Sequence, residues 1–132
     1  MNADERQDLV NHRITKAKDT LNEVEVLVQN SFLNNAVNRI YYACFYAVSA
    51  LFIDRNINAK SHSGTKQMFG LHFVKTGLVS KEASDFYTII FEQRHTGDYD
   101  DYVVFERNKV ITFLEQAKNF ISEIEVILLK HK

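Results

Sequence analysis

The stretch from Gln93 to Asp101 concentrates the residues of this chain that are best suited to chemistry. Directly after an apolar run it holds an arginine, a histidine and three aspartates: Arg94, His95, Asp98, Asp100 and Asp101. A guanidinium group can hold a phosphate with two hydrogen bonds, and an imidazole group exchanges a proton near neutral pH. The segment therefore indicates a binding site, a catalytic site or a capped helix end.

Arg94 has two interpretations from the sequence. Near a helix C-terminus its charge is favourable with the helix dipole, and it can pair with the nearby aspartates. Alternatively, it binds a ligand or phosphate. His95 follows directly, so on a helix the two side chains point roughly 100° apart. This geometry favours His95 as a helix-terminal cap over a catalytic base. For the aspartates, the favoured interpretation is turn-forming partners of Arg94 rather than a cation site.

Arg39 is the second arginine of interest, because it lies in a helical segment built mostly of apolar residues. A buried guanidinium needs a partner. One interpretation is an internal ion pair or hydrogen-bond network with a carboxylate of the Asp98–Asp101 loop. The other is a functional cleft that Arg39 shares with Arg94.

The remaining candidate residues have plainer interpretations. His62 and His72 are expected to be surface or capping residues, and no pair of histidines has the spacing of a zinc site. The single cysteine, Cys44, lies in the most apolar segment and is expected to be a buried thiol. We therefore predict no metal and no cofactor.

The composition describes one domain, residues 1–132, with 45% hydrophobic and 25% charged residues. A net charge of −1 argues against a large, purely electrostatic nucleic-acid binder. The first residues lack the apolar core of a signal peptide. The uncharged run from Ile40 to Ile53 is shorter than the roughly 20 residues that a membrane span requires. These features predict a cytoplasmic protein with no membrane partner.

Apolar residues recur at steps of three and four along most of the chain, which predicts helices throughout. Ser31 is a candidate N-cap, and Gly97 is a candidate helix stop. The segment from Phe32 to Arg55 is apolar almost all round and should lie at the centre. The predicted helices are Asp4–Gln29, Phe32–Arg55, Ser61 or Ser63 to Lys75, Ser80–His95 and Glu106–Lys130. The expected fold is an all-α, up-and-down antiparallel bundle of four main helices, with the third position split into two shorter helices.

Three motifs resemble those of HEPN-domain proteins, in particular a subfamily of small stand-alone members. The first is the run from Ala36 to Ala47, in which Arg39 precedes a Tyr-Tyr-Ala-x-Phe pattern. The second comprises Lys60-Ser61-His62-Ser63-Gly64 and the segment 69–77. The third is Arg94 followed by Gly97-Asp98-Tyr99-Asp100-Asp101. The resemblance extends from about residue 36 to residue 105.

The resemblance implies a helical bundle that usually forms dimers. Many HEPN proteins are metal-independent ribonucleases with an arginine, four to six intervening residues and then a histidine, at a helix end that faces a partner subunit. Arg94 matches that arginine. The histidine is not matched, because the corresponding positions hold Tyr99, Asp100 and Asp101.

The missing histidine favours a non-catalytic binding or accessory protein over an enzyme. The resemblance implies a homodimer, a nucleotidyltransferase as partner in a toxin–antitoxin or defence-like pair, and a nucleotide or RNA as ligand. The expected ligand-binding residues are Arg94, Arg39, Asp98 and Tyr99. The alternative is a metal-independent ribonuclease at the dimer interface, with Arg94, His95 and Tyr99 as catalytic candidates. In a third alternative, Tyr99 or Tyr102 accepts a nucleotidyl group from the partner.

Overall fold

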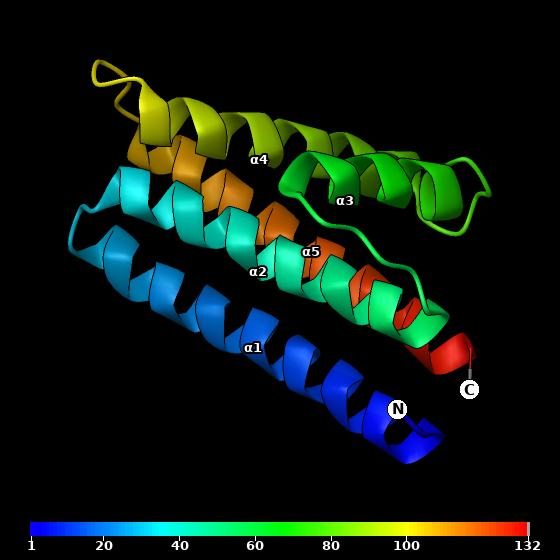
Figure 1. Ribbon diagram of the computed structural model, residues 1–132. Helices are drawn as coiled ribbons and strands as arrows, with labels where there is room; N and C mark the ends of the chain where they lie inside the picture. The colour runs from blue at the N-terminus through cyan, green and yellow to red at the C-terminus, as the bar shows by residue number, and fades with distance from the viewer. Residues whose placement is uncertain (132) are drawn as a thin grey trace.

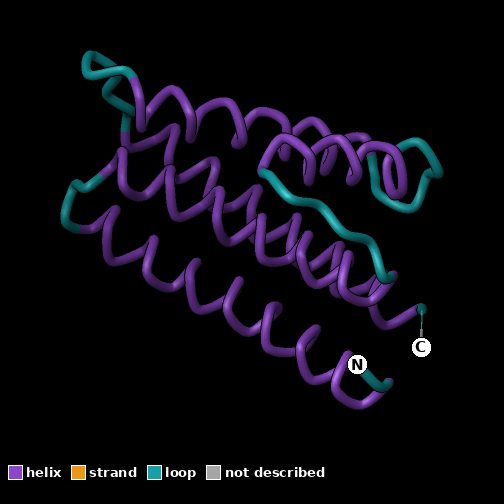
Figure 2. The backbone as a smooth tube through the Cα atoms, in the orientation of Figure 1, coloured by secondary structure: helices purple, strands orange, loops and turns teal. Residues whose placement is uncertain are grey.

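The computed structural model describes residues 1–131, and within them the chain is entirely helical (Figure 2). It contains five α-helices, with one π-helical segment, η1, after α3. The elements are α1 (Ala3–Gln29), α2 (Leu33–Arg55), α3 (His62–Phe69), η1 (Gly70–Val74), α4 (Lys81–Tyr99) and α5 (Arg107–Lys130). The prediction of an all-α protein is confirmed.

The helix α2 lies at the centre and packs against α1, α4 and α5. Figure 1 shows the long helices side by side, with the short α3 outside them and close to α4. The start of α1 and the end of α5 lie at the same end of the molecule (Figure 1). There the guanidinium of Arg6 donates a hydrogen bond to the carbonyl of Ile53, and His131 is bonded to Asp54.

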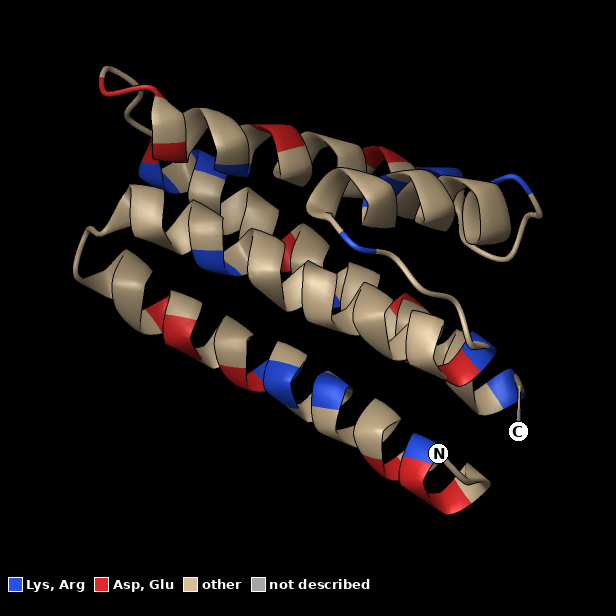
Figure 3. Ribbon diagram, in the orientation of Figure 1, with Lys and Arg blue, Asp and Glu red and all other residues tan. Residues whose placement is uncertain are grey.

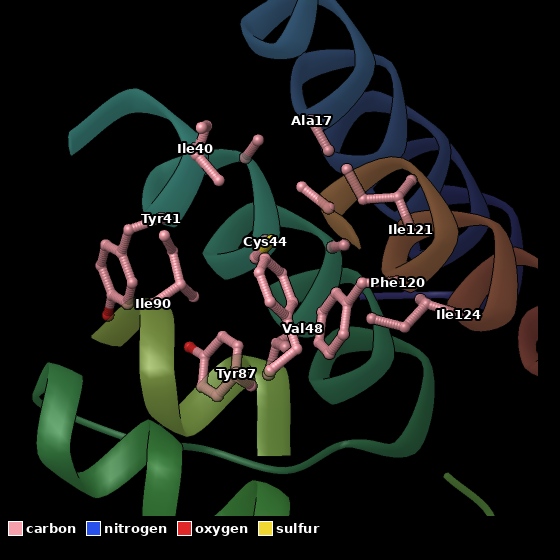
Figure 4. Close-up of a cluster of buried hydrophobic side chains, with 14 of the residues drawn as sticks. Ala17, Ile40, Tyr41, Cys44, Val48, Tyr87, Ile90, Phe120, Ile121 and Ile124 are labelled. Carbon is pink, nitrogen blue, oxygen red and sulfur yellow. The ribbon is translucent and has the colours of Figure 1, made fainter. Parts of the chain in front are cut away.

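The central position of α2 follows from its composition. Its buried residues cover a wide face of the helix, most of its other residues are half-buried, and Cys44 is fully buried, as predicted. Figure 4 shows side chains from the surrounding helices packed around this segment. By length and composition alone α2 could cross a membrane, but 61% of its most apolar window is buried inside the bundle. Core helices of this kind are apolar because they pack against other helices.

The predicted role of Ser31 as the N-cap of α2 is wrong. Ser31 has a φ of 62° and belongs to the end of α1, where its N–H donates to Val28 and that of Phe32 donates to Leu27. This is a Schellman motif with serine in the left-handed position where glycine is more usual. Phe32 takes the N-cap position of α2 without a side-chain hydrogen bond.

The predicted stop of α4 at Gly97 is also wrong, because the helix continues to Tyr99. Gly97 has a packing role instead. A Cβ atom at this position would lie 2.8 Å from Cε2 of Phe105, whose ring is buried. The glycine therefore lets the loop after α4 fold closely against the helix that precedes it.

The turns around α3 follow the sequence more closely. The hydroxyl of Ser61 accepts a hydrogen bond from the N–H of Gly64 and caps α3, and Ser80 caps α4 in the same way. Gly77 has a φ of 77°, a left-handed conformation that glycine adopts without steric cost. The segment expected to be one helix reaching Lys75 instead changes to π-helical hydrogen bonding at Gly70.

Charged residues are distributed over the outer surface in both signs (Figure 3). In this view blue and red segments alternate along α1 and recur near the helix ends. This mixture agrees with the net charge of −1. A binding site for an anion therefore has to depend on local geometry rather than on a broad basic face.

Candidate functional site

Arg94 points from α4 onto the aromatic side chains of α2. Its side chain is only 11% exposed, and its guanidinium carbon lies 4.8 Å from the centroid of the Tyr41 ring and 6.0 Å from that of Tyr42. A cation over an aromatic face is stabilised by the ring quadrupole, and more strongly where water is excluded. The two aromatic rings thus support a guanidinium that is almost buried.

The hydrogen bonding of Arg94 is incomplete. Its Nη1 lies 3.5 Å from Oδ2 of Asp98, one helical turn later, and within residues 1–131 its buried Nε has no hydrogen-bond partner. Asp98 also accepts from the amide of Asn38 at 3.1 Å. The predicted pairing of Arg94 with an aspartate is present, but the Asp98 carboxylate is shared with Asn38 and lies 3.5 Å from Arg94.

A second group of polar atoms lies behind the same aromatic face. The hydroxyl of the fully buried Tyr41 is 2.6 Å from Nδ1 of His62. The hydroxyl of Tyr87 lies beside that of Tyr41 (Figure 4), but their geometry does not make a hydrogen bond within residues 1–131. Tyr87, Tyr41 and His62 therefore form a row of polar groups that begins in the core and ends beside Arg94.

Burial determines the protonation of this row. It raises the pKa of Tyr41 to about 12 and that of Tyr87 well above 10. Both phenols are therefore protonated near neutral pH, so the Tyr41 hydroxyl can donate to Nδ1 of His62. Burial and then the charge of Arg94 lower the pKa of His62. Neutral His62 accepting at Nδ1 carries its proton on Nε2, an assignment that follows from the hydrogen bond.

The sequence predicted a surface or capping role for His62 and did not predict its position against the aromatic side chains of α2. His62 is the first residue of α3, and its ring centroid lies 4.6 Å from that of Phe45. The Ser61–Gly64 cap fixes the turn that directs His62 toward α2. Gly64 has little room for a side chain, since a Cβ there would be 2.9 Å from Oγ of Ser61. The Ser-His-Ser-Gly segment was the available signal.

His95 and Tyr99 lie on a different face of α4 from Arg94. Their rings are tilted by 44° with centroids 4.7 Å apart, and Tyr99 is 72% exposed. Because α4 remains helical to Tyr99, residues 95 and 99 are one turn apart and point outward together. Tyr102, in the following loop, is 94% exposed. Within one chain, neither His95 nor Tyr99 adds to the group formed by Arg94 and Asp98.

Arg39 does not pair with the Asp98–Asp101 loop. Its Nε lies 3.6 Å from Oε2 of Glu23 on α1, and its side chain is 33% exposed. Its guanidinium carbon is also 5.5 Å from the centroid of Tyr42, the ring that Arg94 approaches as well. Both arginines thus lie near one aromatic ring, although their carboxylate partners differ.

An open groove of about 560 Å³ lies along α1 and α2 beside Arg39. Its lining residues are Glu23, Val26, Leu27, Asn35, Asn38 and Arg39. Asn38 connects the groove to the Arg94 group, because its amide donates to Asp98. The volume lies within the usual range of small-molecule sites.

The acidic residues after Arg94 do not assemble into a metal site. Oδ1 of Asp100 accepts a hydrogen bond from the N–H of Tyr102, which forms a local turn, and Asp98 faces Arg94 and Asn38. Within residues 1–131 no three histidine, cysteine, aspartate or glutamate side chains gather as metal ligands. These carboxylates accept hydrogen bonds from neighbouring groups of the same chain.

Comparisons with known proteins agree with the helical fold. The HEPN domain model matches residues 10–127. A "UPF0332 protein" of Thermotoga maritima is 40% identical over 124 residues, which cover 94% of this chain and 94% of that protein.

Two proteins of Methanocaldococcus jannaschii are also similar. "Putative toxin MJ0142" is 33% identical over 116 residues, covering 88% of this chain and 79% of that protein. "Putative toxin MJ0605" is 31% identical over 130 residues, covering 94% of this chain and 96% of that protein. These matches include Arg94 and the aromatic residues of α2 within their span. The chain belongs to the HEPN-domain family.

Proposed function

We propose that this protein is a non-catalytic HEPN-type accessory protein that binds the phosphate of a nucleotide or RNA at Arg94. It works with a nucleotidyltransferase in a toxin–antitoxin or defence-like pair. The observation that carries the binding proposal is the state of Arg94. Its side chain is 11% exposed, its one carboxylate contact is 3.5 Å long, and its Nε is buried without a partner within residues 1–131.

A nearly buried charge with so little hydrogen bonding is costly for the folded protein. A phosphate has several acceptor oxygens and can take two hydrogen bonds from one guanidinium. A phosphate that reaches the exposed part of the guanidinium would add hydrogen bonds that Arg94 lacks. The Asp98 contact would then hold the guanidinium in place between binding events.

We infer the lack of catalysis from the absence of the histidine that the family motif requires. The positions expected for that histidine hold Tyr99, Asp100 and Asp101. His95 points outward with Tyr99 and does not approach Arg94 within one chain. A phosphate bound at Arg94 would therefore have no general base at the position that the motif provides.

The partnership is inferred from the relatives. Two of them are named as putative toxins, which supports a two-component role for this chain as well. We further propose that the protein is a cytoplasmic homodimer. The long helices would form the four-helix up-and-down bundle that the family resemblance and the arrangement in Figure 1 support.

Titration with AMP and with short single-stranded RNAs tests the binding proposal. Wild type should bind, and Arg94→Ala should weaken binding at least tenfold because it removes a bidentate phosphate contact. Adenosine, which lacks the phosphate, serves as the control ligand. Equal binding by wild type and Arg94→Ala, or binding by neither, would show that Arg94 is not the site.

The alternative function is a metal-independent ribonuclease that uses Arg94 with His95 or Tyr99 from a second copy. The exposure of His95 and Tyr99 favours this option, because both rings lie on the surface where another subunit can reach them. RNA cleavage in EDTA that disappears in Arg94→Ala would establish it. Inactivity of the purified protein on varied RNAs would exclude it.

A further inference from the structure

His62 and Arg94 lie on the same pair of aromatic rings, although they come from different helices. The His62 ring centroid is 5.5 Å from that of Tyr41 and 5.5 Å from that of Tyr42. The guanidinium carbon of Arg94 is 4.8 Å and 6.0 Å from the same two centroids. One aromatic face of α2 thus carries both an arginine and a histidine.

The orientation of His62 is fixed by its only hydrogen bond within residues 1–131. Nδ1 is 2.6 Å from the Tyr41 hydroxyl, and the phenol remains protonated because burial raises its pKa to about 12. The protonated hydroxyl can donate to Nδ1, and in that tautomer Nε2 carries the imidazole proton. The ring is partly exposed, so the Nε2–H can donate to a bound group.

The surroundings of His62 are suited to an anion. The titratable and charged groups that face its ring are Tyr41 and Tyr42 from α2 and Arg94 from α4, with Lys66 one turn further along α3. Within residues 1–131, the ion pairs and hydrogen bonds of His62 include no carboxylate. Arg94, whose charge acts on His62, is also the residue whose buried Nε has no hydrogen-bond partner within residues 1–131.

We propose that His62 is the second phosphate ligand of the Arg94 site, donating from Nε2 to the anion that Arg94 binds. Tyr41 is then a positioning residue that holds the imidazole through Nδ1. This inference rests on the proposed function. It adds a phosphate ligand from α3, whereas the residues next to Arg94 in sequence provide none. His95, although adjacent to Arg94 in sequence, takes no part.

The competing explanation is that His62 only packs against Phe45 and satisfies the Tyr41 hydroxyl. His62→Phe separates the two explanations, because phenylalanine keeps the aromatic packing and removes both ring nitrogens. His12→Phe, at an exposed histidine of α1 to which no site role is assigned, is the matched control. Tyr41→Phe tests positioning, and thermal unfolding of each variant shows that it is folded.

AMP is the probe, with affinity measured by calorimetry at constant ionic strength. We expect His62→Phe to weaken binding about tenfold, the effect of losing one hydrogen bond to a charged group. Tyr41→Phe should weaken binding less, and His12→Phe should not change it. If Arg94→Ala weakens binding but His62→Phe does not, the role of His62 is wrong and the proposed function stands. If Arg94→Ala has no effect or AMP does not bind, both are wrong.

Nuclear magnetic resonance of the imidazole groups gives a readout that packing alone would not change. An anion bound beside His62 favours its protonated form, so adding AMP should raise the pKa of His62 and leave that of His95 unchanged. On lowering the pH, AMP affinity should also increase more steeply for wild type than for His62→Phe. In the variant, only the titration of the AMP phosphate affects the affinity. An unchanged His62 titration would overturn the assignment.

Discussion

The guanidinium carbon of Arg94 lies 4.8 Å from the centroid of the Tyr41 ring, and the hydroxyl of the same tyrosine lies 2.6 Å from Nδ1 of His62. One buried side chain thus connects α4 with α3 through its ring face and its polar tip. Tyrosine suits this position because the body of its side chain is apolar and its end can form a hydrogen bond. The positions of Arg94 and His62 therefore both depend on Tyr41.

Replacing Arg94 by methionine should separate binding from stability. Methionine fills much of the same space and removes a charge whose burial is incompletely offset. We expect the free energy of unfolding to change by less than about 1 kcal/mol while AMP binding is lost. Urea unfolding combined with calorimetry measures both quantities. A loss above about 3 kcal/mol would identify the contacts of Arg94 with Asp98 and Tyr41 as primarily structural.

Gly97→Ala should destabilise the protein despite the higher helix propensity of alanine. The added Cβ would lie 2.8 Å from Cε2 of Phe105, and we expect a cost of about 1–3 kcal/mol. Gly70→Ala is the matched control: no atom lies within 4 Å of its added Cβ, and its φ of −58° is helical. There we expect a gain of up to about 1 kcal/mol. Equal effects at the two glycines in thermal unfolding would contradict the close approach of Phe105.

The lowered pKa of His62 predicts a specific pH dependence of stability. Because its pKa in the folded protein lies below the unfolded value of 6.5, the unfolded chain binds the proton more readily. This contribution is present above about pH 6.5 and is lost as the pH falls toward the folded pKa. Wild type should therefore lose more stability than His62→Phe between pH 7.5 and pH 5.5. Parallel curves from urea unfolding would show that His62 does not contribute.

The proposed homodimer predicts twice the 15.4 kDa chain mass in solution. Light scattering after size-exclusion chromatography at micromolar concentration measures this mass directly. A dimer would also allow His95 and Tyr99 of one subunit to approach the other. A monomer mass throughout the micromolar range would exclude any mechanism that depends on a cleft between two subunits.

The sequence by itself predicted the helical elements well where periodicity and capping agree. The apolar surface of α2 determined its central position, and Ser61, Gly77 and Ser80 have the turn roles expected of their residue types. The prediction failed at Ser31 and Gly97. Ser31 ends α1 instead of capping α2, and Gly97 accommodates a ring from a later loop. The contact of Gly97 with Phe105 comes from outside the helix and leaves no periodic pattern in the sequence.

The sequence also identified Arg94 as the residue most suited to binding, and its contact with Asp98 follows from their spacing of one helical turn. Only the tertiary structure decided its other neighbours. Arg39 pairs with Glu23, and His62 approaches across a sequence separation that no spacing rule covers. The reason is physical: helical periodicity specifies which residues share a face of one helix, whereas packing specifies which faces of different helices meet.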